Sequence, residues 1–283
     1  MKIKFSKMQG AGNDFVVIDS TKEQFSLSPE NIRFLADRHF GVGADQVLVI
    51  EKTELPDVDF KYRIFNHDGG EVEQCGNGAR CFARYVHDKG LTDKKKIKVE
   101  TVKEIIEPEL LDDGSVRVMM NTPSFRPSDL PFNPKGLPER EINGEKQWAV
   151  SFQGKLWWFS ISSIGNPHVT IQVENLDETP IKELGSFIEN HPAFPARVNV
   201  GFLQIQDPHH GKFAVWERGA GQTLACGTGN CAAAATAIKN EAMESPVALE
   251  NLGGTLTLEW EGEGMNIYLR GPAEMVFDSE IEI

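Results

Sequence analysis

The chain is poor in cysteine, in positive charge and in long apolar segments. Only 4 of its 283 residues are cysteine, far fewer than a disulfide-stabilised secreted domain of comparable length uses. The first residues contain no apolar run followed by a cleavage sequence, so no secretion signal is predicted. Together these features predict a protein of a reducing compartment, most simply the cytoplasm, in which the four thiols are available for purposes other than crosslinking.

The shortage of positive charge excludes two classes of partner. The sequence contains 29 Lys and Arg against 42 Asp and Glu, a formal net charge of −13, so neither nucleic acid nor an anionic membrane would attract it. The longest uncharged stretch, residues 219–238, consists mainly of Gly, Ala, Thr, Cys, Asn and Gln and is too weakly apolar to cross a bilayer. We therefore expect no nucleic acid and no membrane as partner.

What remains is an ordinary globular composition with more strands than helices. Helices are predicted to start at Ser28-Pro29 and to cover about 77–89, 180–190 and 229–240. Alternation of apolar and polar residues predicts strands near 3–5, 58–64, 97–100, 116–120, 156–161, 168–173, 198–205, 213–216, 256–260 and 265–269. Because these strands do not alternate regularly with helices, the predicted class is α+β and not a doubly wound parallel sheet. Five prolines between 123 and 138 predict an extended connector near the middle of the chain.

One short signature occurs twice. Cys75-Gly76-Asn77-Gly78 and Cys226-Gly227-Thr228-Gly229 both read Cys-Gly-x-Gly, and both open a predicted helix. Their cysteines are 151 positions apart (226 − 75), close to half the chain. The same residues in the same structural context in each half predict an internal duplication.

A cysteine at a helix start has a distinctive chemistry. The first backbone N–H groups of a helix lack partners and the helix dipole is positive there, so the thiolate of Cys75 or Cys226 should be favoured and its pKa lowered. The glycines let the backbone approach a bound carboxylate closely. A free cysteine is more often a small buried apolar residue, which is what we expect of Cys81 and Cys231, about one and a half turns further along each helix.

Metal and phosphate chemistry fit the two segments poorly. The cysteine spacings are not those of paired zinc ligands, and neither glycine-rich segment continues into the Gly-Lys-Ser/Thr of a phosphate-binding loop. No metal site is predicted. If the two halves face each other, a thiolate on one side of a bound carbon could remove a proton while a thiol on the other side returns one. That is a racemisation or epimerisation that needs no cofactor.

Several further segments make the sequence recognisable. It resembles the diaminopimelate epimerase family in five motifs that follow one another in family order and are followed by Gly271-Pro272-Ala273, so that the likeness covers nearly the whole chain. The motifs are Gly10-Ala11-Gly12-Asn13-Asp14-Phe15, Phe40-Gly41-Val42-Gly43-Ala44-Asp45-Gln46, Glu73-Gln74-Cys75-Gly76-Asn77-Gly78-Ala79-Arg80, Gly165-Asn166-Pro167-His168, and Glu217-Arg218-Gly219-Ala220-Gly221 with Ala225-Cys226-Gly227-Thr228-Gly229.

The resemblance implies a fold and an activity. It implies two pseudo-symmetric domains, each a mostly antiparallel sheet wrapped around a central helix, with the active site in the cleft between them. The last strand returns to the first domain, which gives residues 1–121 with 271–283 and residues 122–270. The implied reaction is conversion of L,L-2,6-diaminopimelate to meso-diaminopimelate, in lysine and peptidoglycan precursor biosynthesis, by a homodimer without pyridoxal phosphate or another cofactor.

The resemblance also implies residue roles. Cys75 and Cys226 are the two acid–base groups. The residues implied to bind the small amino-acid substrate are Asn13, Gln46, Asn66, Gly76, Asn77, Asn166, Asn199, Glu217, Arg218, Gly227 and Thr228, of which Gly76, Asn77, Gly227 and Thr228 would hold the reacting carboxylate through backbone groups. A bidentate cation such as Arg218 suits the distal carboxylate, and His168 could orient or tune a cysteine.

Three positions depart from the family pattern, and two other functions stay open. His67 stands where a small residue is usual, Gly70 where serine is more frequent, and Gln222 where an acidic residue often stands. The nearest alternative is a two-cysteine racemase of the proline or hydroxyproline type, although the segments around Asn13 and Glu217 favour the diaminopimelate branch. The other alternative is a non-catalytic binder in which the two helix starts hold a dicarboxylate or a phosphate.

Overall fold

The computed structural model describes residues 2–23, 25–72 and 76–283, which form two compact units. The first unit comprises Met1–Met119 and Arg270–Ile283, and the second comprises Met120–Leu269. The proline-rich segment 123–138 therefore belongs to the second unit, where it includes a 3-10 turn at Pro127–Asp129. The predicted α+β class is confirmed.

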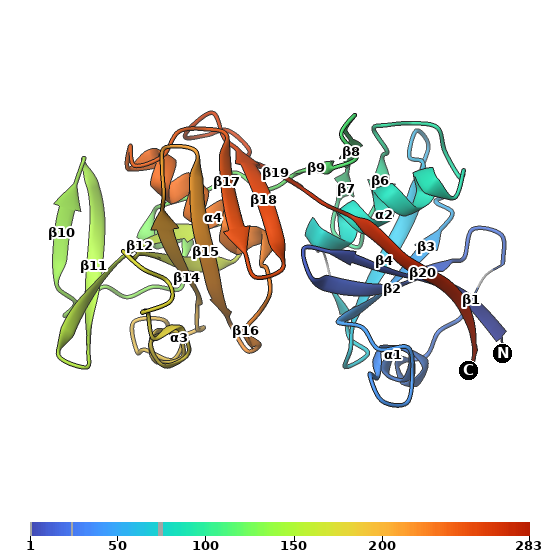
Figure 1. Cartoon of the computed structure of the whole chain (residues 1–283), viewed down its shortest axis with the longest axis horizontal. Helices are drawn as coiled ribbons and strands as arrows, with labels where there is room; N and C mark the ends of the chain where they lie inside the picture. The colour runs from blue at the N-terminus through green and yellow to red at the C-terminus, as the bar shows by residue number, and fades with distance from the viewer. Residues whose placement is uncertain (1, 24, 73–75) are drawn as a thin grey trace. The chain divides into compact units, whose positions relative to one another are not determined.

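The first unit is a sheet with two helices (Figure 1). Its strand order is β20-β1-β2-β3-β4-β6-β7, with β5 paired to β4, and β20 near the C-terminus lies beside the N-terminal β1. The helices are α1 (Pro29–Ala36) and α2 (Gly76–Asp88). The strands are β1 (Lys2–Gly10), β2 (Asn13–Asp19), β3 (Gln46–Glu51), β4 (Phe60–Asn66), β5 (Glu71–Val72), β6 (Val99–Glu100), β7 (Ile105–Ile106) and β20 (Glu274–Glu282). Outside this sheet, β8 (Glu109–Leu110) pairs with β9 (Val116–Met119), which also pairs with β19 (Tyr268–Gly271).

The second unit repeats this plan. Its strands follow the order β10-β11-β12-β13-β14-β15-β17-β18, with β16 paired to β15. Its helices are α3 (Ile181–Glu189) and α4 (Gly227–Lys239). The strands are β10 (Glu139–Ile142), β11 (Glu145–Phe152), β12 (Lys155–Ser163), β13 (Pro167–Gln172), β14 (Asn199–Ile205), β15 (His210–Glu217), β16 (Gly221–Gln222), β17 (Val247–Asn251) and β18 (Gly254–Glu259), after which β19 (Tyr268–Gly271) leads to the last strand of the first unit.

The pairing pattern confirms the internal duplication. In the first unit, β1–β2 is antiparallel, β2–β3 parallel, β3–β4 and β4–β5 antiparallel, β4–β6 parallel and β6–β7 antiparallel. The series β12–β13, β13–β14, β14–β15, β15–β16, β15–β17 and β17–β18 has the same directions in the same order. Helices α1 and α3 stand at one equivalent point of this series, and α2 and α4 at another. Each sheet is mostly antiparallel, as expected.

The helices α2 and α4 are the central helices of the two units. Helix α4 packs against β12, β13, β14, β17 and β18, which is possible because Ala232–Ala235 offers only small, fully buried side chains to the surrounding strands. Helix α2 packs against β1, β2, β3 and β9, and its Phe82, Ala83 and Val86 are buried. The buried Cys81 and Cys231 confirm the prediction that these two thiols belong to the core.

Predicted and observed elements differ in instructive ways. All four predicted helices are present, and helix α1 begins as expected, with a capping box between Ser28 and Asn31. Strands β2 and β3 were not predicted, because Phe15–Ile18 and Val47–Ile50 are buried on both faces and lack the alternation of a half-buried strand. The strand expected at 97–100 is limited to β6, and the one expected at 265–269 lies later, as β19.

Two negative findings concern the described residues alone. Within the described ranges, no helix is long and apolar enough to cross a membrane. Residues 2–23, 25–72 and 76–283 also contain no group of His, Cys, Asp and Glu side chains arranged to hold a metal ion.

Candidate functional site

In the second unit, Cys226 stands at the entrance of the central helix. It is the N-cap residue of α4, in an extended backbone conformation, and only 6% of its surface is exposed. Gly229 packs closely beside it, since a Cβ at that position would lie 3.3 Å from the Cys226 Cβ and 3.4 Å from the Cys226 sulfur. The backbone N–H groups of Gly227 and Thr228 belong to the first turn of α4, where a helix offers unpaired donors to an anion.

The electrostatics of Cys226 differ from the expectation. Burial raises the pKa of the Cys226 thiol well above its usual value, and the nearby Glu217 carboxylate raises it further. The Thr228 hydroxyl and the Gly229 N–H favour the thiolate, but they do not outweigh burial. The lowered pKa predicted for this cysteine from its helix start is therefore wrong, because a neighbouring carboxylate and loss of water oppose the helix dipole.

A chain of side-chain contacts leads from Cys226 into the core. The Cys226 sulfur lies 3.6 Å from the Thr228 hydroxyl, and Asn166 Nδ2 donates to that hydroxyl at 3.3 Å. The Asn166 carbonyl oxygen in turn lies 2.9 Å from His168 Nε2. Burial and the charge of Arg218 lower the pKa of His168 to about 3, so the imidazole is neutral at physiological pH.

Asn199, Glu217 and Arg218 lie together at the adjoining ends of strands β14 and β15. Asn199 Nδ2 donates to the Pro167 carbonyl at 3.0 Å, and Asn199 Oδ1 accepts from the Arg218 backbone N–H at 3.0 Å. The Arg218 guanidinium donates to the carbonyl of Ala196 at 3.2 Å, while Glu217 accepts from the Thr223 hydroxyl. Asn166, His168, Asn199, Glu217, Arg218, Gly227 and Thr228 are thus assembled around Cys226 within one unit.

The first unit brings its predicted residues together in a similar way. Asn77, in the first turn of α2, donates through Nδ2 to Asn13 Oδ1 at 3.2 Å. Gln46 Nε2 donates to Asn66 Oδ1 at 2.9 Å. Gly76 is the first residue of α2. Cys75 lies outside the described residues, so its predicted role stays a prediction.

The duplication relates the two sets of residues to each other. Strand register pairs Phe15 with Gln46 in one unit and His168 with Asn199 in the other, so Gln46 and Asn199 are equivalent. In the first unit Gln46 pairs with Asn66. In the second unit Val200 pairs with Trp216, so the next positions, Asn199 and Glu217, stand opposite each other. Asn66 and Glu217 are therefore equivalent.

Two further equivalences follow from the strand and helix starts. Asn13, the first residue of β2, corresponds to Asn166, which directly precedes β13, and Asn77 corresponds to Thr228 in the first turn of the equivalent helices. The residue after Asn66 is His67 and the residue after Glu217 is Arg218, so the departure at His67 occupies the position equivalent to Arg218.

Four charged residues that support Asn13 were not predicted. Asp45 accepts from Asn13 Nδ2 at 3.0 Å, and Arg38 bridges Asp45 and Asp14, with contacts of 2.8 Å to each. Burial raises the pKa of Asp14, but hydrogen bonds from Arg38 and Lys7 outweigh it and hold the pKa well below its usual range. Both aspartates lie in the motifs quoted above, so position alone could have indicated them, whereas their mutual contact could not be read from the sequence.

A fifth unpredicted residue, Arg80, lies on the opposite side of Asn77. It is completely buried and donates to Asn77 Oδ1 at 2.9 Å and to the Pro272 carbonyl at 3.1 Å. The buried guanidinium therefore fixes which side of the Asn77 amide carries the oxygen.

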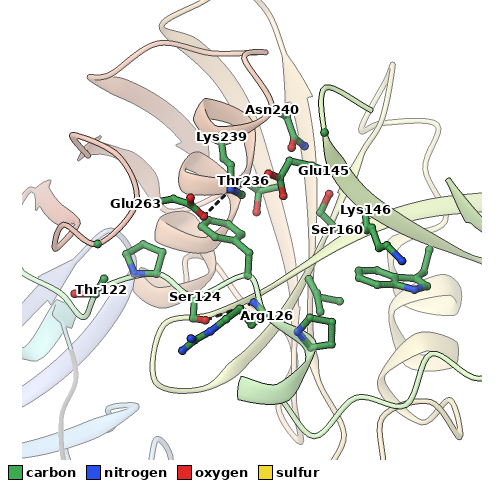
Figure 2. A pocket seen from close by; sticks show the side chains of 17 residues that line it. Thr122, Ser124, Arg126, Glu145, Lys146, Ser160, Thr236, Lys239, Asn240 and Glu263 are labelled. Carbon is green, nitrogen blue, oxygen red and sulfur yellow. Dashed lines mark hydrogen bonds and ion pairs between the residues drawn. The ribbon is translucent and has the colours of Figure 1, made fainter. Parts of the chain in front are cut away.

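A separate pocket of about 650 Å³ lies in the second unit near the other end of α4 (Figure 2). Its lining includes Thr236, Lys239 and Asn240, and none of the predicted site residues. Lys239 is neutralised there by Glu145 at 2.8 Å and Glu263 at 2.6 Å. The pocket therefore does not compete with the region around Cys226 as the candidate site.

Comparison with solved structures supports the fold. A phenazine biosynthesis protein of the PhzF family from Bacillus anthracis superposes with a TM-score of 0.69 at 18% identity, covering 100% of both chains. A hydroxyproline epimerase from Agrobacterium vitis superposes with a TM-score of 0.67 at 15% identity, covering 99% of this chain and 92% of that one. At these identities the similarity establishes a shared two-domain fold and nothing about the substrate.

Comparison of sequences is more specific. The family profile described as diaminopimelate epimerase matches residues 5–126 and 160–276. The diaminopimelate epimerase of Herminiimonas arsenicoxydans is 50% identical over 283 residues, which is 100% of both chains. That of Nitrosospira multiformis is 52% identical over 283 residues, covering 100% of this chain and 99% of the relative. With its repeated Cys-Gly-x-Gly helix starts and this full-length similarity, the chain belongs to the diaminopimelate epimerase family.

Proposed function

We propose that the protein epimerises L,L-2,6-diaminopimelate to meso-diaminopimelate without a cofactor, as a step in lysine and peptidoglycan precursor biosynthesis. It is an amino-acid epimerase of the isomerase class. The observation that carries the proposal is the duplicated Cys-Gly-x-Gly helix start, one in each of two units of the same topology, in a chain of this family. A racemase of the proline type is not favoured, since the relatives with 50% and 52% sequence identity are diaminopimelate epimerases.

The proposed chemistry is a transfer of protons on opposite sides of one carbon. A thiolate removes the proton from the substrate Cα, and the electron pair of the broken C–H bond passes into the adjacent carboxylate. A thiol on the other side then delivers its proton to the same carbon, so the configuration inverts and the two cysteines exchange protonation states. Backbone N–H groups of Gly76, Asn77, Gly227 and Thr228 would stabilise the additional negative charge on that carboxylate.

The environment of Cys226 supports a division of roles in the resting enzyme. Its pKa is raised by burial and by Glu217, so we assign Cys226 as the protonated thiol of the pair. Cys75 would be the thiolate. The residue equivalent to Glu217 in the first unit is the neutral Asn66, which lacks the charge that raises the pKa of Cys226.

The second amino-acid end of the substrate needs a cation for its carboxylate and acceptors for its ammonium group. We assign the carboxylate to Arg218, whose guanidinium can bind it with two hydrogen bonds. Amide oxygens of Asn66, Asn166 and Asn199, together with the carboxylate of Glu217, supply acceptors. Asn13 and Gln46 complete the proposed binding residues, and neutral His168 acts on the site through Asn166.

Solvent deuterium tests the proposal directly. Incubating the protein with L,L-diaminopimelate in heavy water should produce the meso isomer with deuterium at the inverted α-carbon, because the donated proton comes from a thiol that exchanges with solvent. Cys226→Ala should reduce turnover by about 10²-fold or more. Cys231→Ala is the matched control, since this thiol is buried in the core of the same helix and should retain activity.

The alternatives predict different labelling. Deuterium in proline but not in diaminopimelate would replace the proposal with a proline-type racemase. Binding of diaminopimelate without any label would leave a non-catalytic binder.

We also propose that the protein is a homodimer acting in the cytoplasm. Support for dimerisation comes from β20, which forms an edge of the first unit's sheet. There the side chains of Val276 and Phe277 are 55% and 46% exposed. Large exposed apolar side chains on an edge strand favour association with another chain. The cytoplasm is supported by the small number of cysteines and by a mechanism that needs reduced thiols.

A further inference from the structure

We propose that Thr228 is a positioning residue whose hydroxyl group donates a hydrogen bond to the Cys226 thiolate, and that Asn166 and His168 fix the direction of this bond. The inference rests on the proposed function, in that it assumes Cys226 must become a thiolate during each catalytic cycle. It assigns a role to the Thr228 side chain in addition to that of its backbone N–H.

The direction of each hydrogen bond follows from the chemistry of the groups. The Asn166 carbonyl oxygen can only accept, so His168 Nε2, 2.9 Å away, must carry the hydrogen. The Asn166 Nδ2 group can only donate, so the Thr228 oxygen accepts from it at 3.3 Å. The hydroxyl hydrogen of Thr228 is then free to point at the Cys226 sulfur, 3.6 Å away.

This arrangement serves both protonation states of Cys226. When the cysteine is a thiol, the Thr228 oxygen still has a lone pair for the S–H group. When it is a thiolate, only the hydroxyl can donate between these two residues, and a hydrogen bond to a charged acceptor is worth more than one to a neutral group. A rotation of one hydroxyl hydrogen is the only change required when the proton leaves.

The charged and titratable side chains around the sulfur do not supply such a donor themselves. Glu217 disfavours the thiolate, while His168 is neutral and reaches the sulfur only through Asn166 and Thr228. Arg218 is engaged with the carbonyl of Ala196. Besides the backbone N–H of Gly229, the Thr228 hydroxyl is the group found to favour the thiolate.

The equivalent chain in the first unit has the opposite direction. There Arg80 donates to Asn77, Asn77 donates to Asn13, and Asn13 donates to Asp45. The helix residue is thus a donor to the strand residue, whereas in the second unit the strand residue donates to the helix residue.

Two substitutions between the halves account for the reversal. The position equivalent to His168 is Phe15, which has no hydrogen to donate to Asn13, and the position equivalent to Arg80 is Cys231. In the second unit the strand residue therefore donates to a helix hydroxyl group, whose own hydrogen is left to point toward Cys226.

The test measures the ionisation of Cys226 without relying on catalysis. The protein is treated with iodoacetamide across a range of pH, and the alkylated peptide that contains Cys226 is quantified by mass spectrometry. The pH midpoint of the alkylation rate reports the thiolate, whereas the plateau rate reports access to the sulfur. Thr228→Val keeps the shape of the side chain and removes the hydroxyl, Thr228→Ser restores it, and Thr228→Ala substitutes for the valine variant if that one does not fold.

We expect Thr228→Val to have its midpoint at higher pH, with about tenfold less thiolate at any pH below it, and Thr228→Ser to match the unsubstituted protein. In the epimerase assay, Thr228→Val should lower kcat more than it changes KM. An unchanged midpoint in the valine variant, or equal midpoints in the valine and serine variants, would overturn the inference. Absence of solvent deuterium in diaminopimelate with the unsubstituted protein would instead overturn the proposed function, and the midpoint comparison would still decide the role of Thr228.

Discussion

A pair of buried amides behind Cys226 offers a quantitative test of how this site is held. Asn230 and Asn251 exchange two hydrogen bonds, at 2.8 Å and 3.0 Å. Asn230 also donates to the Cys226 carbonyl at 2.8 Å, and Asn251 donates to the Leu249 carbonyl at 2.9 Å. Two of these four bonds join α4 to strand β17, and the other two anchor the amides to the N-cap of α4 and to β17 itself.

The perturbation is replacement of each amide by leucine, which has the same branching and no polar atoms. Asn230→Leu leaves the Asn251 oxygen and one of its N–H bonds without a partner in a buried environment, a cost of about 3 kcal/mol in unfolding free energy. Asn251→Leu likewise leaves the Asn230 oxygen and one of its N–H groups unpaired, so it should also cost about 3 kcal/mol. In the double variant no unpaired amide group remains at either position. Its loss of unfolding free energy should therefore be about 2 kcal/mol smaller than the sum of the losses in the two single variants.

Urea unfolding followed by tryptophan fluorescence is the appropriate assay. All five tryptophans lie between residues 148 and 260, within the second unit, so the signal reports that unit alone. The two single variants and the double variant form a double-mutant cycle. Losses that add to within about 0.5 kcal/mol would refute the reasoning, because independent sites behave in that way.

Two further predictions concern pH and association. The pKa of His168 is lowered from 6.5 to about 3. Between these two pH values the unfolded chain binds a proton at this histidine that the folded protein does not, so the free energy of unfolding is highest above pH 6.5 and falls as the pH drops toward 3. His168→Gln should therefore flatten the dependence of the urea midpoint on pH in this window. A slope that is the same in the His168→Gln variant would contradict this. If the proposed dimer forms through the exposed edge strand β20, Phe277→Asp should convert it to a monomer in sedimentation velocity, while the control Lys4→Asp on the neighbouring β1 should leave the mass unchanged. A dimer in both variants would assign the interface elsewhere.

Local sequence patterns predicted the parts of the fold whose causes are local. The Ser28-Pro29 helix start, the four helices and the two buried core thiols were all predicted correctly, since capping and helical periodicity depend on residues a few positions apart. The two Cys-Gly-x-Gly segments were also enough to predict the duplication. Strands β2 and β3 escaped prediction because their burial on both faces depends on the helices that cover them.

The candidate site divides in the same way. Motif order identified the asparagines, Glu217 and Arg218, but not Arg38, Asp45 and Arg80, whose contacts join segments that are distant in the sequence. Nor could it show that Gln46 and Asn199 are equivalent, because that relation depends on strand register.

By itself, then, the sequence indicated the few residues proposed to carry the chemistry and the positive helix starts on which they stand. The tertiary structure decided how Cys226 ionises. A helix dipole is a property of adjacent residues, and it predicted a lowered pKa. Burial and the charge of Glu217 come from packing between α4 and the end of β15, and they raise the pKa instead. Because desolvation and Coulomb energies depend on distances in space, only the folded chain could set the protonation state of this cysteine.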